Sequence, residues 1–199
     1  MARLKIYTFP DIVLKQTASP VERVEKSMHS LADDMLETMY GAPGIGLAAN
    51  QVGILQRILV IDTDYDSLDP DEAEEATQNG EMQGEVVAGR ILVHRKPIII
   101  INPEIIYKEG EISLNEGCLS VPSYNAEVKR AEKIKVQYQD IDGLTHVLSA
   151  EDLQAVCIQH EMDHLNGKLF IDRLSPLKKQ MAKKQLLKER KEREEEEGS

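Results

Sequence analysis

The stretch Gln159-His-Glu-Met-Asp-His-Leu-Asn-Gly167 decides how the rest of this 199-residue chain is organised. If it is helical, His160 and His164 lie one turn apart on the same face, where both can bind one metal ion. Glu161 then lies beside them and can transfer a proton. Because a catalytic metal usually has three protein ligands and one open position for water, another segment must supply the third ligand.

The flanking sequence predicts a helix that runs to about Leu165. Ser149 lies three residues before Asp152, as in a capping box at a helix start, and Gly167 follows as a stop signal. Four residues recur at helical spacing and therefore share one face: Leu153, Cys157, His160 and His164. Apolar atoms would then adjoin the histidines as a pocket wall. The alternative is that both histidines are structural residues of a core helix.

The third ligand is expected to be a cysteine. Cys118 lies in the turn Asn115–Pro122, between two strand-like segments, and its thiolate suits Fe(II) or Zn(II). Cys157 is the competing candidate, but its place on the helix favours a role in the pocket wall. The other histidines of the chain have no such setting, so we expect them to be structural or exposed.

The glycine-rich stretch Gly41–Gly53 has three interpretations. Its glycine spacing fits neither the dinucleotide fingerprint nor the phosphate-binding loop, which argues against a phosphate cradle. It can be a tight turn before a strand, since Gly44 and Gly46 allow close approach of the backbone. It can also be a backbone edge that binds an extended peptide, with Gln51 presenting its amide to a reacting carbonyl group.

Hydrophobic periodicity predicts further helices and strands around this core. Apolar residues at helical spacing predict a helix over residues 24–40, and Ser175-Pro176 starts a C-terminal helix. That helix has a weak apolar edge of Leu177, Met181 and Leu187. Pro103 is expected to end its strand, and Asp142-Gly143 to form a hairpin turn. Strands are expected over residues 55–61, 91–94, 98–103, 133–138 and 144–148.

Length and composition indicate one domain with a charged end. A chain of 199 residues can bury a core without disulfides, and two cysteines are too few for a disulfide framework. We expect one domain over residues 1–177 and a charged helix or tail over residues 178–199. The residues after Met1 lack the apolar centre of a signal peptide, and no apolar run approaches the ~20 residues of a membrane span. We therefore expect a protein of a reducing compartment, the bacterial cytoplasm.

Charge is unevenly distributed along the chain. The formal net charge of −11 argues against a protein that binds nucleic acid over its whole surface. Residues 64–85 include nine acidic and no basic residues, whereas Lys178–Arg193 includes eight basic and two acidic residues. The acidic insertion at residues 63–90 has too few large apolar residues to offset its ordering entropy, so we expect a mobile loop.

Three segments, taken in order, resemble the signature motifs of the peptide deformylases: Gly44-Ile-Gly-Leu-Ala-Ala-Asn-Gln51, Glu116-Gly-Cys-Leu-Ser120 and Gln159-His-Glu-Met-Asp-His164. Three matches at family-like spacing are far more specific than any one of them. The resemblance covers residues 5–177, with the acidic insertion as the main departure. It implies a metal-dependent hydrolase that removes the N-formyl group from the N-terminal formylmethionine of new polypeptides and releases formate.

The resemblance also implies a role for each matched residue. Cys118, His160 and His164 would hold one divalent metal ion, most often Fe(2+), with zinc, nickel or cobalt as substitutes. Glu161 would move the proton of the attacking water to the leaving amine. Gln51 and the backbone N–H of Leu119 would stabilise the oxyanion. The remaining residues would bind substrate: Ile45 and Gly46 would pair with the extended peptide beside Gly44, and Leu114, Leu153, Val156 and Cys157 would line the methionine pocket.

Four further positions bear on the resemblance. Glu116 and Asp163 would orient a ligating histidine, with Arg130 paired to Glu116. Ordinary surface ion pairs are the alternative for Asp163 and Arg130. Asn125 stands where family members often carry an arginine near the substrate backbone, so that substrate contact is not carried over.

Together these features predict an α+β fold, in which mixed or antiparallel sheets wrap around the metal-bearing helix. Two other functions compete with the deformylase: a metallopeptidase that cleaves internal bonds, and a non-catalytic, metal-stabilised binding protein. The presence of both Glu161 and Gln51 favours catalysis, since neither is needed to hold a metal. The expected partners are nascent formyl-Met polypeptides and, through the basic helix Lys178–Arg193, the ribosome. Neither a membrane nor specific DNA is expected.

Overall fold

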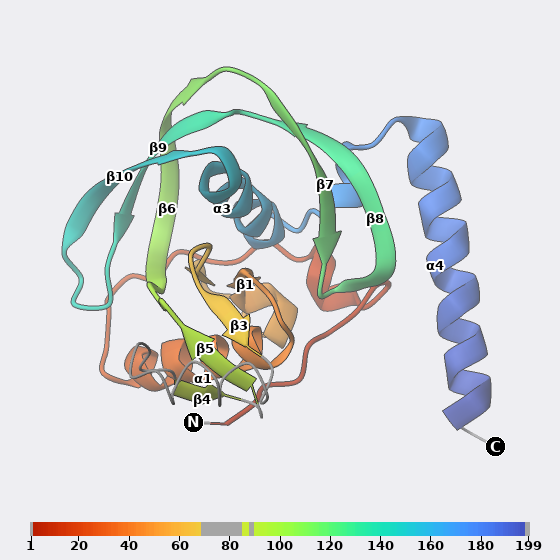
Figure 1. Cartoon of the computed structure of the whole chain (residues 1–199), viewed down its shortest axis with the longest axis horizontal. Helices are drawn as coiled ribbons and strands as arrows, with labels where there is room; N and C mark the ends of the chain where they lie inside the picture. The colour runs from red at the N-terminus through yellow and green to blue at the C-terminus, as the bar shows by residue number, and fades with distance from the viewer. Residues whose placement is uncertain (1, 69–84, 88–89, 198–199) are drawn as a thin grey trace.

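The computed structural model describes residues 2–68, 85–87 and 90–197. The fold is α+β, as the sequence predicts, with helix α3 (Asp152–Leu165) at the centre and strands around it (Figure 1). Every pairing between the described strands is antiparallel. No described helix is both long and apolar enough to cross a membrane.

Five strands form the main sheet, in the order β1-β2-β6-β9-β10. They are β1 (Gly46–Ala48), β2 (Ile58–Ile61), β6 (Ile98–Glu109), β9 (Lys133–Gln139) and β10 (Thr145–Glu151). Helix α3 packs against β1, β2, β9 and β10. Leu59 and Ile100 of the sheet and Ile158 of α3 are fully buried in one shared apolar cluster. The sheet therefore holds α3 in place through an apolar contact.

Helix α3 begins directly where strand β10 ends. The predicted capping role of Ser149 is wrong, because Ser149 lies within β10. Asp152 has φ of 50° and its N–H donates to the carbonyl of Glu132 at 2.9 Å, so the backbone itself turns the strand into the helix. Gly167 follows the helix end as predicted. It has φ of 67°, and an added Cβ would lie 2.5 Å from a backbone oxygen, so only glycine fits there.

Strands β7 (Ile112–Cys118) and β8 (Val121–Arg130) form a separate hairpin on the other side of α3 (Figure 1). Their register shifts between Glu116 and Cys118. Cys118 is the last residue of β7, next to the tight turn that leads into β8. The hairpin thereby carries this cysteine to the helix that bears the two histidines.

Helix α1 (Ser27–Gly41) forms close to the predicted range, although it begins three residues later. The predicted apolar stripe is confirmed: Met28, Ala32, Met35, Leu36 and Met39 are buried. The helix leads into the glycine-rich stretch and packs against β1, which lies within that stretch, and β2, which follows it. Beyond β1 the chain forms a short 3-10 helix, η2 (Ala49–Val52), which carries Gln51.

Strand β6 continues past Pro103, which corrects the prediction that this residue ends the strand. Its partner changes from β2 to β9 near this point, and the register with β9 shifts between Ile101 and Glu104. Asn102 has φ of 51°. Because the ladder is already interrupted there, the missing N–H of the proline costs no strand hydrogen bond.

The acidic insertion contains strands at both of its described ends, where the sequence predicted only a mobile loop. Strands β3 (Asp66–Leu68), β4 (Glu85–Val87) and β5 (Arg90–Val93) form a small sheet in the order β3-β5-β4. Val86 pairs with Ile91, and Val87 is buried. These β-branched residues supply strand propensity within an acidic sequence. Residues 69–84 and 88–89 lie outside the described residues, so the expected mobility is untested.

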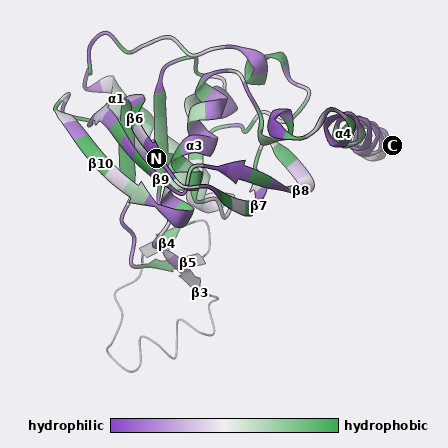
Figure 2. Ribbon diagram, turned by 90° about the horizontal axis from the view of Figure 1, so that it is seen from above, coloured by the Kyte–Doolittle hydropathy of each residue, from purple (hydrophilic) through white to green (hydrophobic). Residues whose placement is uncertain are grey.

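Helix α4 (Pro176–Glu197) packs against the hairpin and the 3-10 helix η3 (Phe170–Arg173) through a face that the sequence did not predict. Ala182 and Leu186 are buried in an apolar cluster. Leu177 and Met181, the expected apolar edge, are 68% and 63% exposed, and Leu187 is exposed as well. Most of the helix is hydrophilic in Figure 2. Ala182 and Leu186 thus form the apolar contact of α4, and the ion pairs Lys179–Asp172 and Arg190–Asp11 add to it.

Candidate active site

Cys118, His160 and His164 meet at one point beneath the hairpin. The Sγ atom and the ring nitrogens that they offer lie within 4.8 Å of one another, and Cys118 Sγ is 3.2 Å from His164 Nε2. Among the described residues, this is the one group of three or more histidine, cysteine and acidic side chains that could hold a metal ion. The two histidines come from successive turns of α3, and the cysteine comes from the end of β7. The sequence predicted that these three residues would meet.

His160 is oriented by a buried carboxylate. Its Nδ1–H donates to Oε2 of Glu116 at 2.8 Å, and this leaves Nε2 for the side of Cys118. An ionised carboxylate is only an acceptor, so it fixes both the tautomer and the direction of the ring. Burial alone would raise the pKa of Glu116, but the hydrogen bonds from Arg130 and His160 outweigh it and hold the pKa below its ordinary value.

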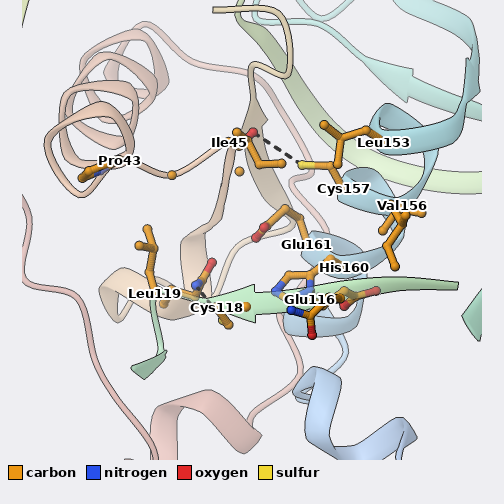
Figure 3. A pocket seen from close by; sticks show the side chains of 16 residues that line it. Pro43, Ile45, Glu116, Cys118, Leu119, Leu153, Val156, Cys157, His160 and Glu161 are labelled. Carbon is orange, nitrogen blue, oxygen red and sulfur yellow. Dashed lines mark hydrogen bonds and ion pairs between the residues drawn. The ribbon is translucent and has the colours of Figure 1, made fainter. Parts of the chain in front are cut away.

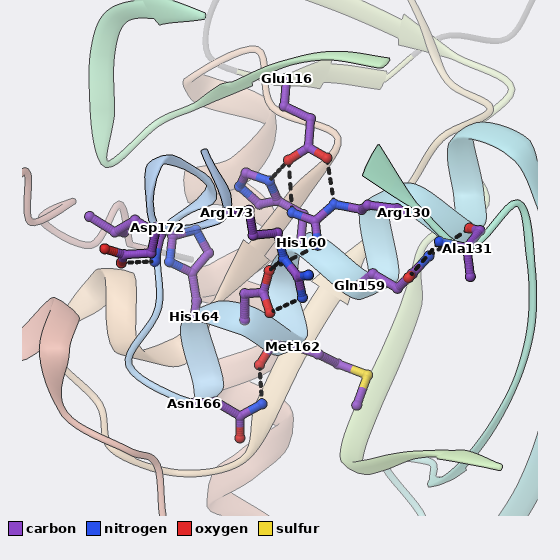
Figure 4. A network of polar contacts seen from close by, with 12 residues as sticks. Glu116, Arg130, Ala131, Gln159, His160, Met162, His164, Asn166, Asp172 and Arg173 are labelled. Atoms are coloured by element: carbon purple, nitrogen blue, oxygen red, sulfur yellow. Dashed lines mark hydrogen bonds and ion pairs between the residues drawn. The ribbon is translucent and has the colours of Figure 1, made fainter. Parts of the chain in front are cut away.

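Arg130 joins this carboxylate to a second one (Figure 4). Its guanidinium donates to both oxygens of Glu116 and, at 2.9 Å, to Oδ2 of Asp163. Arg173 also donates to Asp163, at 2.5 Å from Nε and 2.7 Å from Nη2. The Arg130 side chain has 0% exposure, and those of Glu116 and Asp163 have 5% and 8%. The alternative of ordinary surface ion pairs is therefore wrong.

His164 is the more enclosed of the two histidines. Burial lowers the pKa of His164 well below its ordinary value, and the neighbouring His160 adds to this effect. This shift favours the neutral ring, the form that binds a metal ion. Its Nδ1 has no hydrogen-bond partner among the residues that the structure describes.

Glu161 lies on α3 directly beside the ligand cluster and faces the cavity (Figure 3). The residue is 4% exposed, and its Oε2 atom lacks a partner within the described part of the chain. Burial raises the pKa of Glu161 to about 7, although the charges of His160 and Arg130 oppose the rise. A carboxyl group with a pKa near neutrality can both accept and return a proton.

Gln51 is held with its amide nitrogen directed at the cluster. Its Oε1 accepts the backbone N–H of Ala48 at 2.8 Å, so the Nε2 end lies 3.7 Å from Cys118 Sγ and 3.2 Å from the hydroxyl of Ser120. Gln51 and Ser120 are buried. The donor is thus fixed beside the place where a substrate carbonyl would react.

A cavity of about 400 Å³ opens onto these groups. It is bordered by every residue predicted to bind substrate or take part in catalysis: Gly44, Ile45, Gly46, Gln51, Leu114, Leu119, Leu153, Val156, Cys157 and Glu161. Val156 and Cys157 are buried in its wall, whereas Leu153 is 44% exposed at its rim. Cys157 Sγ lies 3.4 Å from the carbonyl of Ile45 and does not join the ligand cluster (Figure 3).

Strand β1 forms one wall of this cavity and is an edge strand. Its register with β2 pairs Gly46 with Ile61, and Ile45 continues the pairing by accepting the N–H of Asp62 at 2.9 Å. Among the described strands β1 has no second neighbour. A Cβ added to Gly46 would lie 2.6 Å from Glu161 Oε1 and 2.9 Å from Cys157 Sγ, so glycine lets the strand approach α3 closely.

Two residues that support the site were not predicted from the sequence, Ser120 and Arg173. Ser120 was quoted only within a motif, although its hydroxyl contacts Gln51. Arg173 follows α3 after a turn, and no spacing rule connects it to Asp163. Asn125 stands over the cavity-lining Gly117, where an added Cβ would be 2.5 Å from its side-chain oxygen. Of the two missed residues, only Ser120 had a sequence signal, its place as a polar residue inside a motif.

The cluster fits a divalent metal ion on chemical grounds. One thiolate and two imidazole nitrogens are a donor set for Fe(II) or Zn(II), and three protein ligands leave a position open for water or substrate. The buried Glu116–His160 pair supplies the outer support that metal-ligating histidines usually have.

Comparison with known proteins agrees with this site. The polypeptide deformylase family model matches residues 3–180. A peptide deformylase of Erythrobacter litoralis is 49% identical over 193 residues, covering 96% of this chain and 98% of the relative. One from Hamiltonella defensa is 45% identical over 186 residues, covering 94% and 93%. The crystal structure of a peptide deformylase from Legionella pneumophila is 40% identical, with a TM-score of 0.76 over 96% of this chain and 98% of that one.

These matches favour the deformylase over the two competing functions, the metallopeptidase of internal bonds and the non-catalytic binding protein. The family is metal-dependent, and its members are hydrolases that remove the N-formyl group from nascent peptides. With a match over nearly its whole length and relatives at more than 40% identity, this chain belongs to the polypeptide deformylase family.

Proposed function

We propose that Cys118, His160 and His164 hold one divalent metal ion at which this chain hydrolyses the formyl group of N-terminal formylmethionine. When bound, the ion supplies a Lewis acid that makes water a nucleophile near neutral pH. The attack forms a C–O bond at the formyl carbon and breaks the C–N bond, which yields formate and a free amino terminus.

Glu161 moves the proton in this reaction. The carboxylate takes a proton from the attacking water and returns it to the leaving amine, for which a pKa near 7 is well matched. Gln51 Nε2–H and the backbone N–H of Leu119 donate to the carbonyl oxygen as negative charge develops on it. Glu161, Gln51 and two of the proposed ligands, Cys118 and His160, border one cavity, and this observation carries the proposal.

The decisive experiment measures formate release from a formyl-Met tripeptide by protein purified anaerobically with Fe(II). Glu161→Ala is expected to lose turnover by at least about a hundredfold, the usual contribution of a positioned acid–base group, while its metal content stays unchanged. Retained turnover in this variant would overturn the assignment of Glu161. A metal-free variant would point to a structural defect instead, so metal content is measured on the same samples.

We propose Fe(2+) as the native ion, with zinc, nickel or cobalt as substitutes, because a mixed thiolate and imidazole set accepts all of them. Metal analysis of protein purified without added metal tests this. Cys118→Ser is expected to lose metal affinity or change metal preference, and Cys157→Ser is the matched control because Cys157 lies outside the cluster. Equal metal content and equal metal identity in the two variants would remove Cys118 as a ligand.

The substrate is proposed to bind as an added strand on β1. Its backbone lies along Gly44 and Ile45 and pairs with the free edge of β1 from Gly46, in the manner of peptides that extend a sheet. The methionine side chain enters the part of the cavity lined by Leu114, Leu153, Val156 and Cys157. These side chains are apolar or weakly polar, which suits an unbranched thioether.

We also propose that α4 binds the ribosome in the bacterial cytoplasm. A groove of about 1130 Å³ beside α4 is bordered by seven basic side chains: Lys15, Lys129, Lys168, Arg173, Lys178, Lys179 and Lys183. Two acidic residues, Glu127 and Asp172, also border it. A surplus of positive charge attracts the RNA backbone in a salt-dependent way.

Co-sedimentation with ribosomes tests this partner. The double variant Lys178→Glu/Lys183→Glu is expected to sediment less, with unchanged turnover on a tripeptide. The control Arg23→Glu/Lys26→Glu makes the same charge change near the start of α1, away from the groove. If both double variants sediment alike, α4 is not the ribosome contact.

A further inference from the structure

The hydroxyl of Tyr65 holds the backbone at the rim of the cavity. It donates to the carbonyl of Gly44 at 3.1 Å, while the Gly44 N–H donates to the carbonyl of Met39 at 2.9 Å. The peptide units on both sides of Gly44 are therefore tied to other parts of the chain. Gly44 immediately precedes the bend at Ile45, where the chain enters β1.

The Tyr65 ring is itself fixed by a packed group. It meets the ring of Tyr40 edge to face, with centroids 5.0 Å apart and planes at 88°. The guanidinium carbon of Arg95 lies 4.4 Å from the centre of the Tyr40 ring. The Tyr40 hydroxyl donates to Oδ2 of Asp62 at 2.6 Å, and Asp62 is 1% exposed. Tyr65 therefore has little freedom to move away from Gly44.

The same group reaches the next residue of the rim. The backbone N–H of Asp62 donates to the carbonyl of Ile45 at 2.9 Å, and the thiol of Cys157 donates to that oxygen at 3.4 Å. Asp62 thus connects the Tyr40–Tyr65 pair to the strand edge through its own backbone. The rim thus has two bound carbonyls, those of Gly44 and Ile45. The Gly44 carbonyl is bound by Tyr65, which lies at the start of the acidic insertion, directly before β3.

We infer that Tyr65 is a positioning residue for substrates that extend beyond the formylmethionine. It sets the direction of the Gly44–Ile45 peptide and thereby the direction in which the free edge of β1 meets a bound peptide backbone. Tyr65 does not border the cavity and does not touch the reacting atoms. Its effect is expected on binding of the residues after methionine and not on the chemical step. This inference rests on the proposed pairing of substrate with β1.

Tyr65→Phe tests the inference, since it removes the hydroxyl and keeps the ring that packs on Tyr40. On a formyl-Met tripeptide, kcat/KM is expected to fall by about threefold to tenfold, the effect of one net hydrogen bond, entirely through KM. On formyl-Met amide, which has no residue after methionine, kcat/KM is expected to stay within about twofold of wild type, since the lost bond contributes nothing there. Binding of the unformylated tripeptide, measured by calorimetry, weakens by the same factor as KM rises.

Tyr107→Phe is the matched control, because the Tyr107 hydroxyl also bonds another group, Glu109, but lies on the exposed far part of β6. Tyr107→Phe should leave kcat/KM unchanged on both substrates. Unchanged tripeptide kinetics in Tyr65→Phe would overturn the inference, and so would an equal loss on both substrates, which indicates general damage. If the wild-type enzyme treats tripeptide and amide alike, the pairing with β1 fails and the role of Tyr65 fails with it.

Discussion

Replacing Arg130 by methionine should break the buried ion-pair network behind His160 and lower the stability of the fold by a large amount. Arg130 is fully buried between Glu116 and Asp163, and the variant would leave two buried carboxylates without their shared cation. Breaking a buried pair on one side costs about 3–5 kcal/mol. For a domain of this size each kcal/mol lowers Tm by about 2–4 °C, so a drop of about 6–20 °C is expected. Metal affinity should fall by about tenfold to a hundredfold, because Glu116 orients His160.

The pH dependence of this loss has a definite sign. In the folded protein the pKa values of Glu116 and Asp163 are held below their ordinary 4.5 and 3.8. Such groups contribute stability above the unfolded pKa and lose it as the pH falls through the folded pKa. The stability that these ion pairs give the wild type should therefore be complete above about pH 4.5, where unfolded carboxyl groups are ionised, and shrink at lower pH.

Lys129→Met is the matched control for this experiment. Lys129 is the neighbouring residue of β8 and also pairs with a glutamate, Glu111, but the two side chains are 69% and 63% exposed. Such a pair is worth at most about 1 kcal/mol. Urea unfolding of both metal-free variants at neutral pH gives the comparison. If Arg130→Met loses no more stability than Lys129→Met, the buried network does not support the site as argued.

Three further predictions concern other parts of the chain. Gly46→Ala should lower turnover by at least about tenfold with retained metal, because its Cβ would press on the Glu161 carboxylate; wild-type turnover would contradict this. Leu186→Ala should lower the free energy of unfolding by about 2–4 kcal/mol and the exposed Leu187→Ala by less than about 1, measured in urea. Asp172→Asn should lower the free energy of unfolding by about 1–2 kcal/mol at pH 7. This value is reduced by solvent screening, because the two lysine partners of Asp172 are partly exposed. Burial alone would raise the pKa of Asp172, but those lysines hold the pKa far below its ordinary 3.8. The difference in unfolding free energy between wild type and Asp172→Asn should therefore narrow below pH 3.8.

The parts of the fold that were predicted depend on local pattern. The spacing of His160 and His164 predicted a shared helix face, and the apolar stripe of α1 predicted its buried side. Cys118 was predicted from the chemistry of its side chain in a turn, because few residue types can complete such a cluster. In each case, a short segment carried the whole signal.

The parts that were not predicted depend on contacts between distant segments. Pro103 looks like a strand end by itself, but the neighbouring bulge removes the need for its N–H. Ser149 fits a capping pattern, yet pairing with β9 keeps it in a strand. Tyr65 lies in an acidic stretch whose composition predicts a loop, and only the folded chain brings its hydroxyl to Gly44. Such residues are ambiguous until their partners are known.

The packing of α4 decides how its role can be tested. Leu186 shares an apolar cluster with Phe170, whose ring stacks on His160, a proposed metal ligand, with centroids 6.0 Å apart. Deleting the helix would expose Phe170 and loosen the wall behind His160, so a truncated chain could lose turnover and ribosome binding together. Charge reversals at Lys178 and Lys183 leave the Leu186 contact in place. The charge reversals therefore test ribosome binding by α4 without disturbing its packing behind the active site. A truncation changes both at once.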